Sequence, residues 1–150
     1  MRTPTLLAAL LLCGAATAQA QSHRQTIIVQ LDTASVTARG GGFTPDTRAL
    51  GGSTSIIGLL PSGSSVAIDV TLEAGREYFI MGGCDTDCTD LDLRVQATDG
   101  QTTLAEDVAD DDVPVVRFTA REGGPHLLSV MMPGCSTDLC YFGFRIHSKR

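Results

Sequence analysis

Two cysteines and four aspartates lie within nine consecutive residues, Cys84-Asp-Thr-Asp-Cys88-Thr-Asp-Leu-Asp92. Cysteines separated by three residues can close a short loop through a disulfide. Carboxylates so close together offer the hard oxygen ligands that calcium prefers. The segment therefore predicts a clamped turn in an oxidising compartment and a candidate cation site.

A second acidic segment follows the Asp99-Gly100 dipeptide, which is a strong hairpin signal. If this hairpin pairs the strands on either side of it, both acidic loops emerge at the same end of the fold. The carboxylates predicted to hold calcium are Asp85, Asp87, Asp90 and Asp92 from the first loop, and Asp107, Asp110, Asp111 and Asp112 from the second. The spacing is not that of an EF-hand. The alternative is that these aspartates are solvated turn residues, which bond their own backbone.

Four cysteines remain once the amino-terminal segment is set aside: Cys84, Cys88, Cys135 and Cys140. An even count in an exported chain favours disulfides over zinc, and the spacings do not fit a zinc knuckle. Three pairings are open. We favour Cys84–Cys88 with Cys135–Cys140, because each pair flanks an expected turn; a crosslink such as Cys84–Cys135 stays open.

The histidines do not form a local catalytic arrangement. His23 and His147 lie near the expected chain ends, which often fray, and His126 is expected at a strand edge, with Ser129 on the opposite face. No Gly-x-Ser-x-Gly or His-Glu-x-x-His motif occurs. The sequence therefore predicts a protein that is not an enzyme.

Residues 1–20 are typical of a secretory signal peptide. Arg2 supplies positive charge, Leu6 to Cys13 is an apolar run, and Ala18-Gln19-Ala20 fits a cleavage site, so the mature chain is expected to begin at Gln21. We expect no transmembrane segment elsewhere. The protein is predicted to be secreted or periplasmic.

The charge balance narrows the expected partners. Removing Arg2 leaves ten basic and seventeen acidic residues, a net charge of −7. Such an acidic chain is unsuited to nucleic acid or anionic membrane surfaces. We therefore expect a protein or polymer of the extracellular space or envelope.

From Thr54 onward the hydrophobic pattern has a period of two. Between Val66 and Leu72, for example, apolar side chains alternate with Asp69 and Thr71, as in a half-buried strand. About eight such short strands are separated by turn residues. This spacing predicts an all-β fold, an antiparallel β-sandwich of the jelly-roll kind.

Residues 21–53 are expected to form an amino-terminal extension to a sandwich domain over 54–150. In this extension Ile28, Leu31, Ser35 and Ala38 fit one face of a helix, with Gly40-Gly41-Gly42 to end it. A strand with Ile27, Val29 and Leu31 on one face fits equally well. We favour a short helix.

The segment from Gly75 to Tyr78, the acidic cysteine segment that follows it, and Asp107 to Val116 together resemble bacterial pre-peptidase C-terminal (PPC) domains. The closing Cys135-x-x-x-x-Cys140-Tyr141-x-Gly143 does so too. The likeness covers roughly residues 54–147. It implies a jelly-roll sandwich on an exported bacterial protein, often a non-catalytic appendage of a secreted peptidase; relatives in collagenases bind collagen and calcium. Here the domain would be the whole mature protein.

Three functions are consistent with these features. The first is an exported non-catalytic module that binds an extracellular or envelope partner, with calcium as a candidate ligand. The second is a small extracytoplasmic hydrolase. The third is a structural or inhibitory envelope protein whose disulfides only stabilise the fold.

Overall fold

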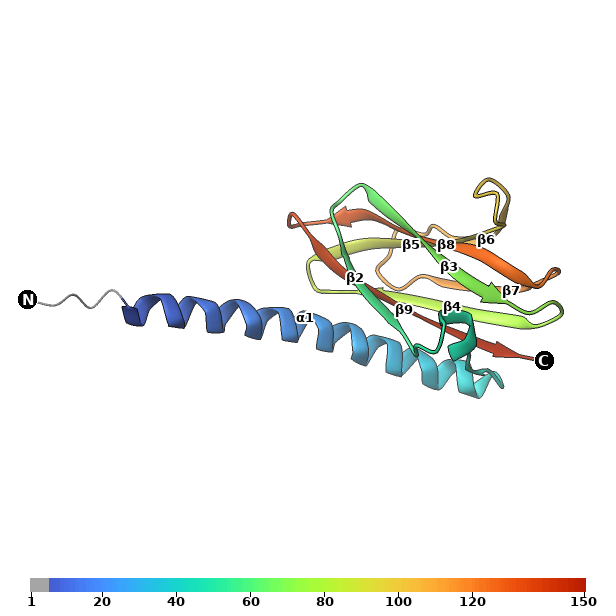
Figure 1. Cartoon of the computed structure of the whole chain (residues 1–150), viewed down its shortest axis with the longest axis horizontal. Helices are drawn as coiled ribbons and strands as arrows, with labels where there is room; N and C mark the ends of the chain where they lie inside the picture. The colour runs from blue at the N-terminus through green and yellow to red at the C-terminus, as the bar shows by residue number, and fades with distance from the viewer. Residues whose placement is uncertain (1–5) are drawn as a thin grey trace, which may run out of the picture.

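The computed structural model describes residues 6–150, with side chains from Ala20 onward. Arg2, which the signal-peptide prediction uses, lies outside the described residues. A single long helix, α1 (Leu6–Gly40), precedes nine strands that form two antiparallel sheets packed face to face (Figure 1). The predicted all-β sandwich is confirmed. No helix among the described residues has the length and apolar character needed to cross a membrane.

The first sheet, called the helix-side sheet here, has the order β1-β9-β4-β7, and β2 also pairs with β9. Its strands are β1 (Thr44–Pro45), β2 (Ile56–Leu60), β4 (Glu77–Cys84), β7 (Val115–Thr119) and β9 (Cys140–Lys149). The second, called the bare sheet, has the order β3-β8-β5-β6. Its strands are β3 (Ser64–Leu72), β5 (Cys88–Gln96), β6 (Thr103–Asp107) and β8 (Gly124–Cys135).

About eight strands are predicted and nine are present, and β3 (Ser64–Leu72) contains the predicted alternating segment from Val66 to Leu72. Alternation places Leu91, Leu93 and Val95 of β5 in the core between the sheets, as period-two patterning requires. The hairpin at Asp99-Gly100 is present, since β5 and β6 pair antiparallel around it. The strand that the sequence did not predict is β1, two residues that pair with the end of β9.

The helix predicted in residues 21–53 is also confirmed, and it continues toward the amino terminus through most of the expected signal segment. Its buried face carries Ile27, Leu31, Ser35 and Ala38; the sequence pattern uses Ile28 in place of Ile27. After Gly40 the chain turns and adds β1 and the 3₁₀ helix η1 (Thr47–Leu50). The extension therefore packs on the sandwich.

The helix covers the outer face of the helix-side sheet (Figure 1). Ile27 and Leu31 form a small apolar cluster with Met81 of β4, separate from the core between the sheets. The close approach depends on glycine, because a Cβ at Gly143 of β9 would lie 2.6 Å from Cγ2 of Ile27. Arg145 adds a bond to the Asp32 carboxylate at 2.6 Å. The chain thus has three layers: helix, sheet and sheet.

Candidate functional site

Four loops meet at one end of the sandwich, which we call the clamped end. They comprise residues 61–63, 85–87, 108–114 and 136–139, each joining two strands at that end. Both predicted acidic loops are among them, so the structure places these loops at the same end. Two backbone bonds tie the loop 108–114 to the strands: Leu91 N–H of β5 donates to the Asp111 carbonyl and Gly82 N–H of β4 donates to the Pro114 carbonyl, both at 2.9 Å.

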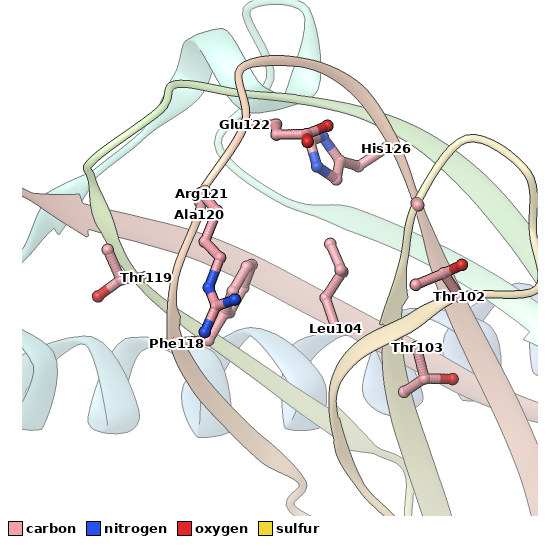
Figure 2. Close-up of a pocket in the computed structure, with 10 residues that line it drawn as sticks. Thr102, Thr103, Leu104, Phe118, Thr119, Ala120, Arg121, Glu122 and His126 are labelled. Atoms are coloured by element: carbon pink, nitrogen blue, oxygen red, sulfur yellow. The ribbon is translucent and has the colours of Figure 1, made fainter.

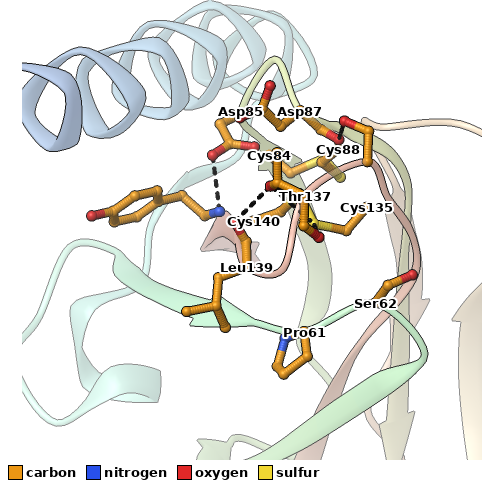
Figure 3. Close-up of a disulfide and its surroundings, with 12 residues drawn as sticks. Pro61, Ser62, Cys84, Asp85, Asp87, Cys88, Cys135, Thr137, Leu139 and Cys140 are labelled. Carbon is orange, nitrogen blue, oxygen red and sulfur yellow. Dashed lines mark hydrogen bonds between the residues drawn. A yellow bond between two sulfur atoms is a disulfide. The ribbon is translucent and has the colours of Figure 1, made fainter.

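Two disulfides close two of these loops (Figure 3). Cys84 bonds to Cys88 and Cys135 bonds to Cys140, which confirms the local pairing. Cys88 and Cys135 are opposite each other where β5 pairs with β8. Ser136 links the two loops, since its N–H and its hydroxyl donate to the Asp87 carbonyl at 2.8 and 2.7 Å.

Asp85 is almost fully buried, with 3% of its surface exposed. Its Oδ2 accepts the Tyr141 N–H at 3.0 Å, and its own N–H donates to the Tyr141 carbonyl at 3.1 Å. These bonds fasten the first acidic loop to β9 (Figure 3). Its Oδ1 is buried and has no hydrogen-bond partner among the described residues.

His23 lies beside this carboxylate, although the two residues are far apart in the sequence. Its Nδ1 is 3.1 Å from Asp85 Oδ2, and its ring stacks on Tyr141 with centroids 5.8 Å apart. Asp87 completes the group: His23, Asp85 and Asp87 each offer a ligand atom, all within 4.8 Å of one another. This is the one group of three such ligand atoms found in the part of the chain that the structure describes.

The sequence does not predict a role for His23. From the sequence, His23 is expected to fray with the amino terminus of the mature chain. In the structure, the docking of α1 holds the His23 ring against Tyr141. No local motif marks this histidine, because its neighbours in space come from β9 and from the loop after β4. The one sequence feature that bears on His23 is the helical periodicity of the segment that follows it, which predicts that this helix has a buried face.

The other predicted ligands lie on β5 and around the loop between β6 and β7. Burial and the nearby charges of Asp110 and Asp111 raise the pKa of Asp90. Burial and the charge of Asp90 likewise raise the pKa of Asp92. The Oδ1 atom of Asp90 is buried without a hydrogen-bond partner in the described chain. Negative charge therefore gathers here, beside the second acidic loop.

Two of the remaining carboxylates bond their own loop. Asp107 accepts N–H groups of Ala109 and Val115, and Asp111 accepts that of Val113. These are the backbone contacts expected of turn aspartates. Asp112 contributes its carbonyl oxygen, which lies 3.7 Å from the Cys84 sulfur. Calcium at these eight aspartates stays a prediction.

The clamped end also exposes apolar side chains beside its carboxylates. Leu139 and Val108 are each 51% exposed, and Val113 is 40% exposed. Leu139 lies on the loop that the Cys135–Cys140 disulfide closes, and Val108 and Val113 lie on the loop between β6 and β7. The surface therefore combines apolar contacts with negative charge on a stiffened backbone.

A hollow of about 470 Å³ opens at the opposite end of the sandwich, between β6 and β7 (Figure 2). Thr102, Leu104, Phe118, Glu122 and His126 are among its lining residues. The His126 Nδ1 lies 3.0 Å from the Gly124 carbonyl. Among the described residues, no hydroxyl or thiol is hydrogen-bonded to this ring, and the four cysteines from Cys84 onward are in disulfides.

No family model matches the sequence, and no curated protein matches it either. Solved structures do resemble the fold. The pre-peptidase C-terminal domain of collagenase from Bacillus anthracis has a TM-score of 0.50 and 16% identity, over 62% of this chain and 87% of that one. PliG of Aeromonas hydrophila, a periplasmic lysozyme inhibitor of g-type lysozyme, has a TM-score of 0.49 and 12% identity, over 63% and 84% of the chains.

At these identities the likeness defines a class of fold and nothing finer. The chain is a two-sheet antiparallel sandwich, and the predicted resemblance to PPC domains is supported at the level of fold.

Proposed function

We propose that the protein is an exported, non-catalytic module that binds a protein or polymer of the extracellular space or cell envelope through its clamped end. The observation that carries this proposal is that two disulfides at this end each close a loop between a strand of one sheet and a strand of the other, while Ser136 bonds these two loops together through the Asp87 carbonyl. Binding residues commonly lie on loops that a rigid scaffold positions. A surface already ordered before contact loses less entropy on binding.

The chemistry of the clamped end favours a partner with both apolar and basic groups. Leu139, Val108 and Val113 supply exposed apolar contacts, and the aspartates around them supply negative charge. Complementary charge would speed association and exclude acidic partners. The acidic balance of the whole chain, with 17 acidic and 11 basic residues, agrees with this preference.

Export is part of the proposal. Disulfides persist in oxidising compartments, and two of them close loops here. Residues 1–20 would act as the signal peptide, leaving Gln21 as the first residue of the mature chain. Residues 21–40 of α1 would then remain docked on the helix-side sheet, because the buried positions Ile27 and Leu31 belong to that part of the helix.

A retention assay tests the proposed surface. The protein is immobilised and exposed to solubilised envelope and extracellular matrix material, and the retained component is quantified. A Leu139→Ser/Val113→Ser double variant should lose at least about tenfold in retention, as expected when apolar side chains at a binding surface are truncated. The control is Leu104→Ser, an exposed leucine at 42% on β6, which should retain as much as the unaltered protein.

Equal retention by the double variant and the unaltered protein would refute the clamped end as the binding surface. If no component is retained by any form, the structural or inhibitory function becomes the better account. Turnover in a screen of ester, peptide and glycoside substrates, abolished by His126→Gln, would instead support the hydrolase and place its chemistry in the hollow.

Calcium held between Asp90 and the second acidic loop is a separate candidate. The buried Oδ1 of Asp90, close to the charges of Asp110 and Asp111, supports it. Calcium at a hundred times its dissociation constant should add about 2.7 kcal/mol to the free energy of unfolding. Thermal unfolding with millimolar calcium and with chelator measures this, and an unchanged melting temperature would end the calcium proposal.

A further inference from the structure

We infer that His23, Asp85 and Asp87 form a binding site for a divalent transition-metal ion of the zinc type, which joins the amino-terminal helix to the clamped end. This inference does not rest on the proposed function, because ion binding at these residues is measured without any partner.

The ligand atoms suit zinc better than calcium. The site pairs an imidazole nitrogen with carboxylate oxygens, and zinc binds both at about 2.0–2.2 Å. Calcium prefers six to eight oxygens and takes imidazole poorly. The His23 Nδ1 and Asp85 Oδ2 atoms are 3.1 Å apart, close to the spacing of neighbouring ligands around a tetrahedral zinc. Asp87 is half-buried and within the 4.8 Å that encloses the group.

A buried carboxylate oxygen gives independent support. Asp85 is only 3% exposed, and its Oδ1 has no hydrogen-bond partner among the described residues. A buried acceptor left unpaired is costly, and a buried charge usually has a partner or a metal. The Oδ2 atom already accepts the Tyr141 N–H, so an ion that binds Oδ1 as well as the His23 nitrogen would give the orphan oxygen its missing partner.

The surrounding contacts hold the ligands in place before an ion arrives. Asp85 is fixed by the backbone of Tyr141, and the ring of the same Tyr141 stacks on His23. The Cys84–Cys88 disulfide closes the loop that carries both aspartates. Contacts of this kind orient ligands and strengthen metal binding. The ion would also stabilise the docking of α1, because one ligand comes from the helix and two come from the loop.

Calorimetric titration of the purified, chelator-stripped protein with Zn²⁺ tests the inference. One equivalent should bind, and Ca²⁺ should displace Zn²⁺ from these three ligands only at a concentration at least about a hundredfold higher, whether or not Ca²⁺ also binds beside Asp90. His23→Gln and Asp87→Asn should each weaken zinc binding at least about tenfold, as loss of one of three ligands predicts. The matched control, Asp111→Asn, removes a charge from the other acidic loop and should leave zinc binding unchanged. Circular dichroism verifies that each variant is folded.

A second measurement separates this site from chelation by the chain terminus. Cleavage after Ala20 would make His23 the third residue, and a free amine, two backbone amides and an imidazole bind Cu²⁺ or Ni²⁺ in a square plane without any carboxylate. Zinc is therefore the probe. Weakening by His23→Gln but not by Asp87→Asn would assign the ion to the terminus and overturn the inference. Zinc binding that neither variant changes, or no binding of one equivalent, would overturn it as well.

Discussion

The outer faces of the two sheets differ in what covers them. On the helix-side sheet, burial is nearly continuous along β4, where every residue from Ile80 to Cys84 is buried. On the bare sheet, burial alternates along β3, where Asp69 and Thr71 are exposed between buried or half-buried neighbours. The difference arises because α1 packs on one sheet and solvent contacts the other.

The covering helix therefore contributes to the clamped end as well as to stability. A sheet covered on both faces requires apolar or small residues on both, and Met81, Gly83 and Gly143 meet this need. The same docking brings His23 to Asp85 at 3.1 Å. Changes to the covered face should therefore disturb both folding and the ligand group, whereas changes to the exposed face should disturb neither.

The largest expected effect on stability comes from truncating a side chain that is buried between α1 and the helix-side sheet. Leu31→Ala removes a fully buried side chain of α1 and should lower the free energy of unfolding by about 2–5 kcal/mol. The matched control is Val29→Ala on the same helix, because Val29 is 54% exposed and should change stability by no more than about 0.5 kcal/mol. Denaturant unfolding of both variants measures the difference; similar values for the two would contradict the docked helix.

A smaller effect is expected from adding one methyl group beneath the helix. In Gly143→Ala the new Cβ would lie 2.6 Å from Ile27 Cγ2 and 3.2 Å from the Ile56 carbonyl. Crowding of this kind should cost about 1–3 kcal/mol. Gly40→Ala is the control, since a Cβ there meets nothing within 4 Å. Thermal unfolding compares them, and an unaffected Gly143→Ala protein would show that the helix can move away freely.

The third prediction concerns the pH dependence of the covered face. His147 is fully buried and lies on the same side of β9 as Gly143 and Arg145. Burial and the positive charges of Arg145 and Arg39 lower the pKa of His147 below its ordinary value of 6.5. The unfolded chain therefore takes up a proton at a higher pH than the folded one does, and stability should fall as the pH drops below about 7.

Unfolding free energies between about pH 7.5 and 5.5 test this, with His147→Gln as the comparison. The unaltered protein should lose more stability over this interval than the variant, because only the former carries the buried imidazole. Equal slopes would show that this imidazole is not shielded from solvent in the folded state.

Most of the sandwich could be predicted from sequence, because its strands obey local rules. Period-two patterning located β3, and Asp99-Gly100 located the hairpin between β5 and β6. The local disulfides were predicted because their cysteines flank turns. β1 was missed, since Thr44 and Pro45 carry no strand pattern and are ordered by pairing with the end of β9.

The candidate site was predictable only in part, for the same physical reason. Asp85 and Asp87 belong to one short acidic loop, which the sequence shows directly as a cluster of aspartates. His23 joins them through the docking of a helix on a sheet, and that contact depends on glycines at Gly83 and Gly143, far along the chain. Tertiary contacts between distant segments leave no periodic signal in a single sequence.

The central claim, that the clamped end is the binding surface, is tested most directly by hydrogen–deuterium exchange with and without solubilised envelope and matrix material. We predict slower amide exchange on binding in the loops 85–87, 108–114 and 136–139. The loop at 97–102 and residues 120–122, beside the hollow at the other end, should exchange as before. Protection confined to the hollow, with the clamped end unchanged, would contradict the account.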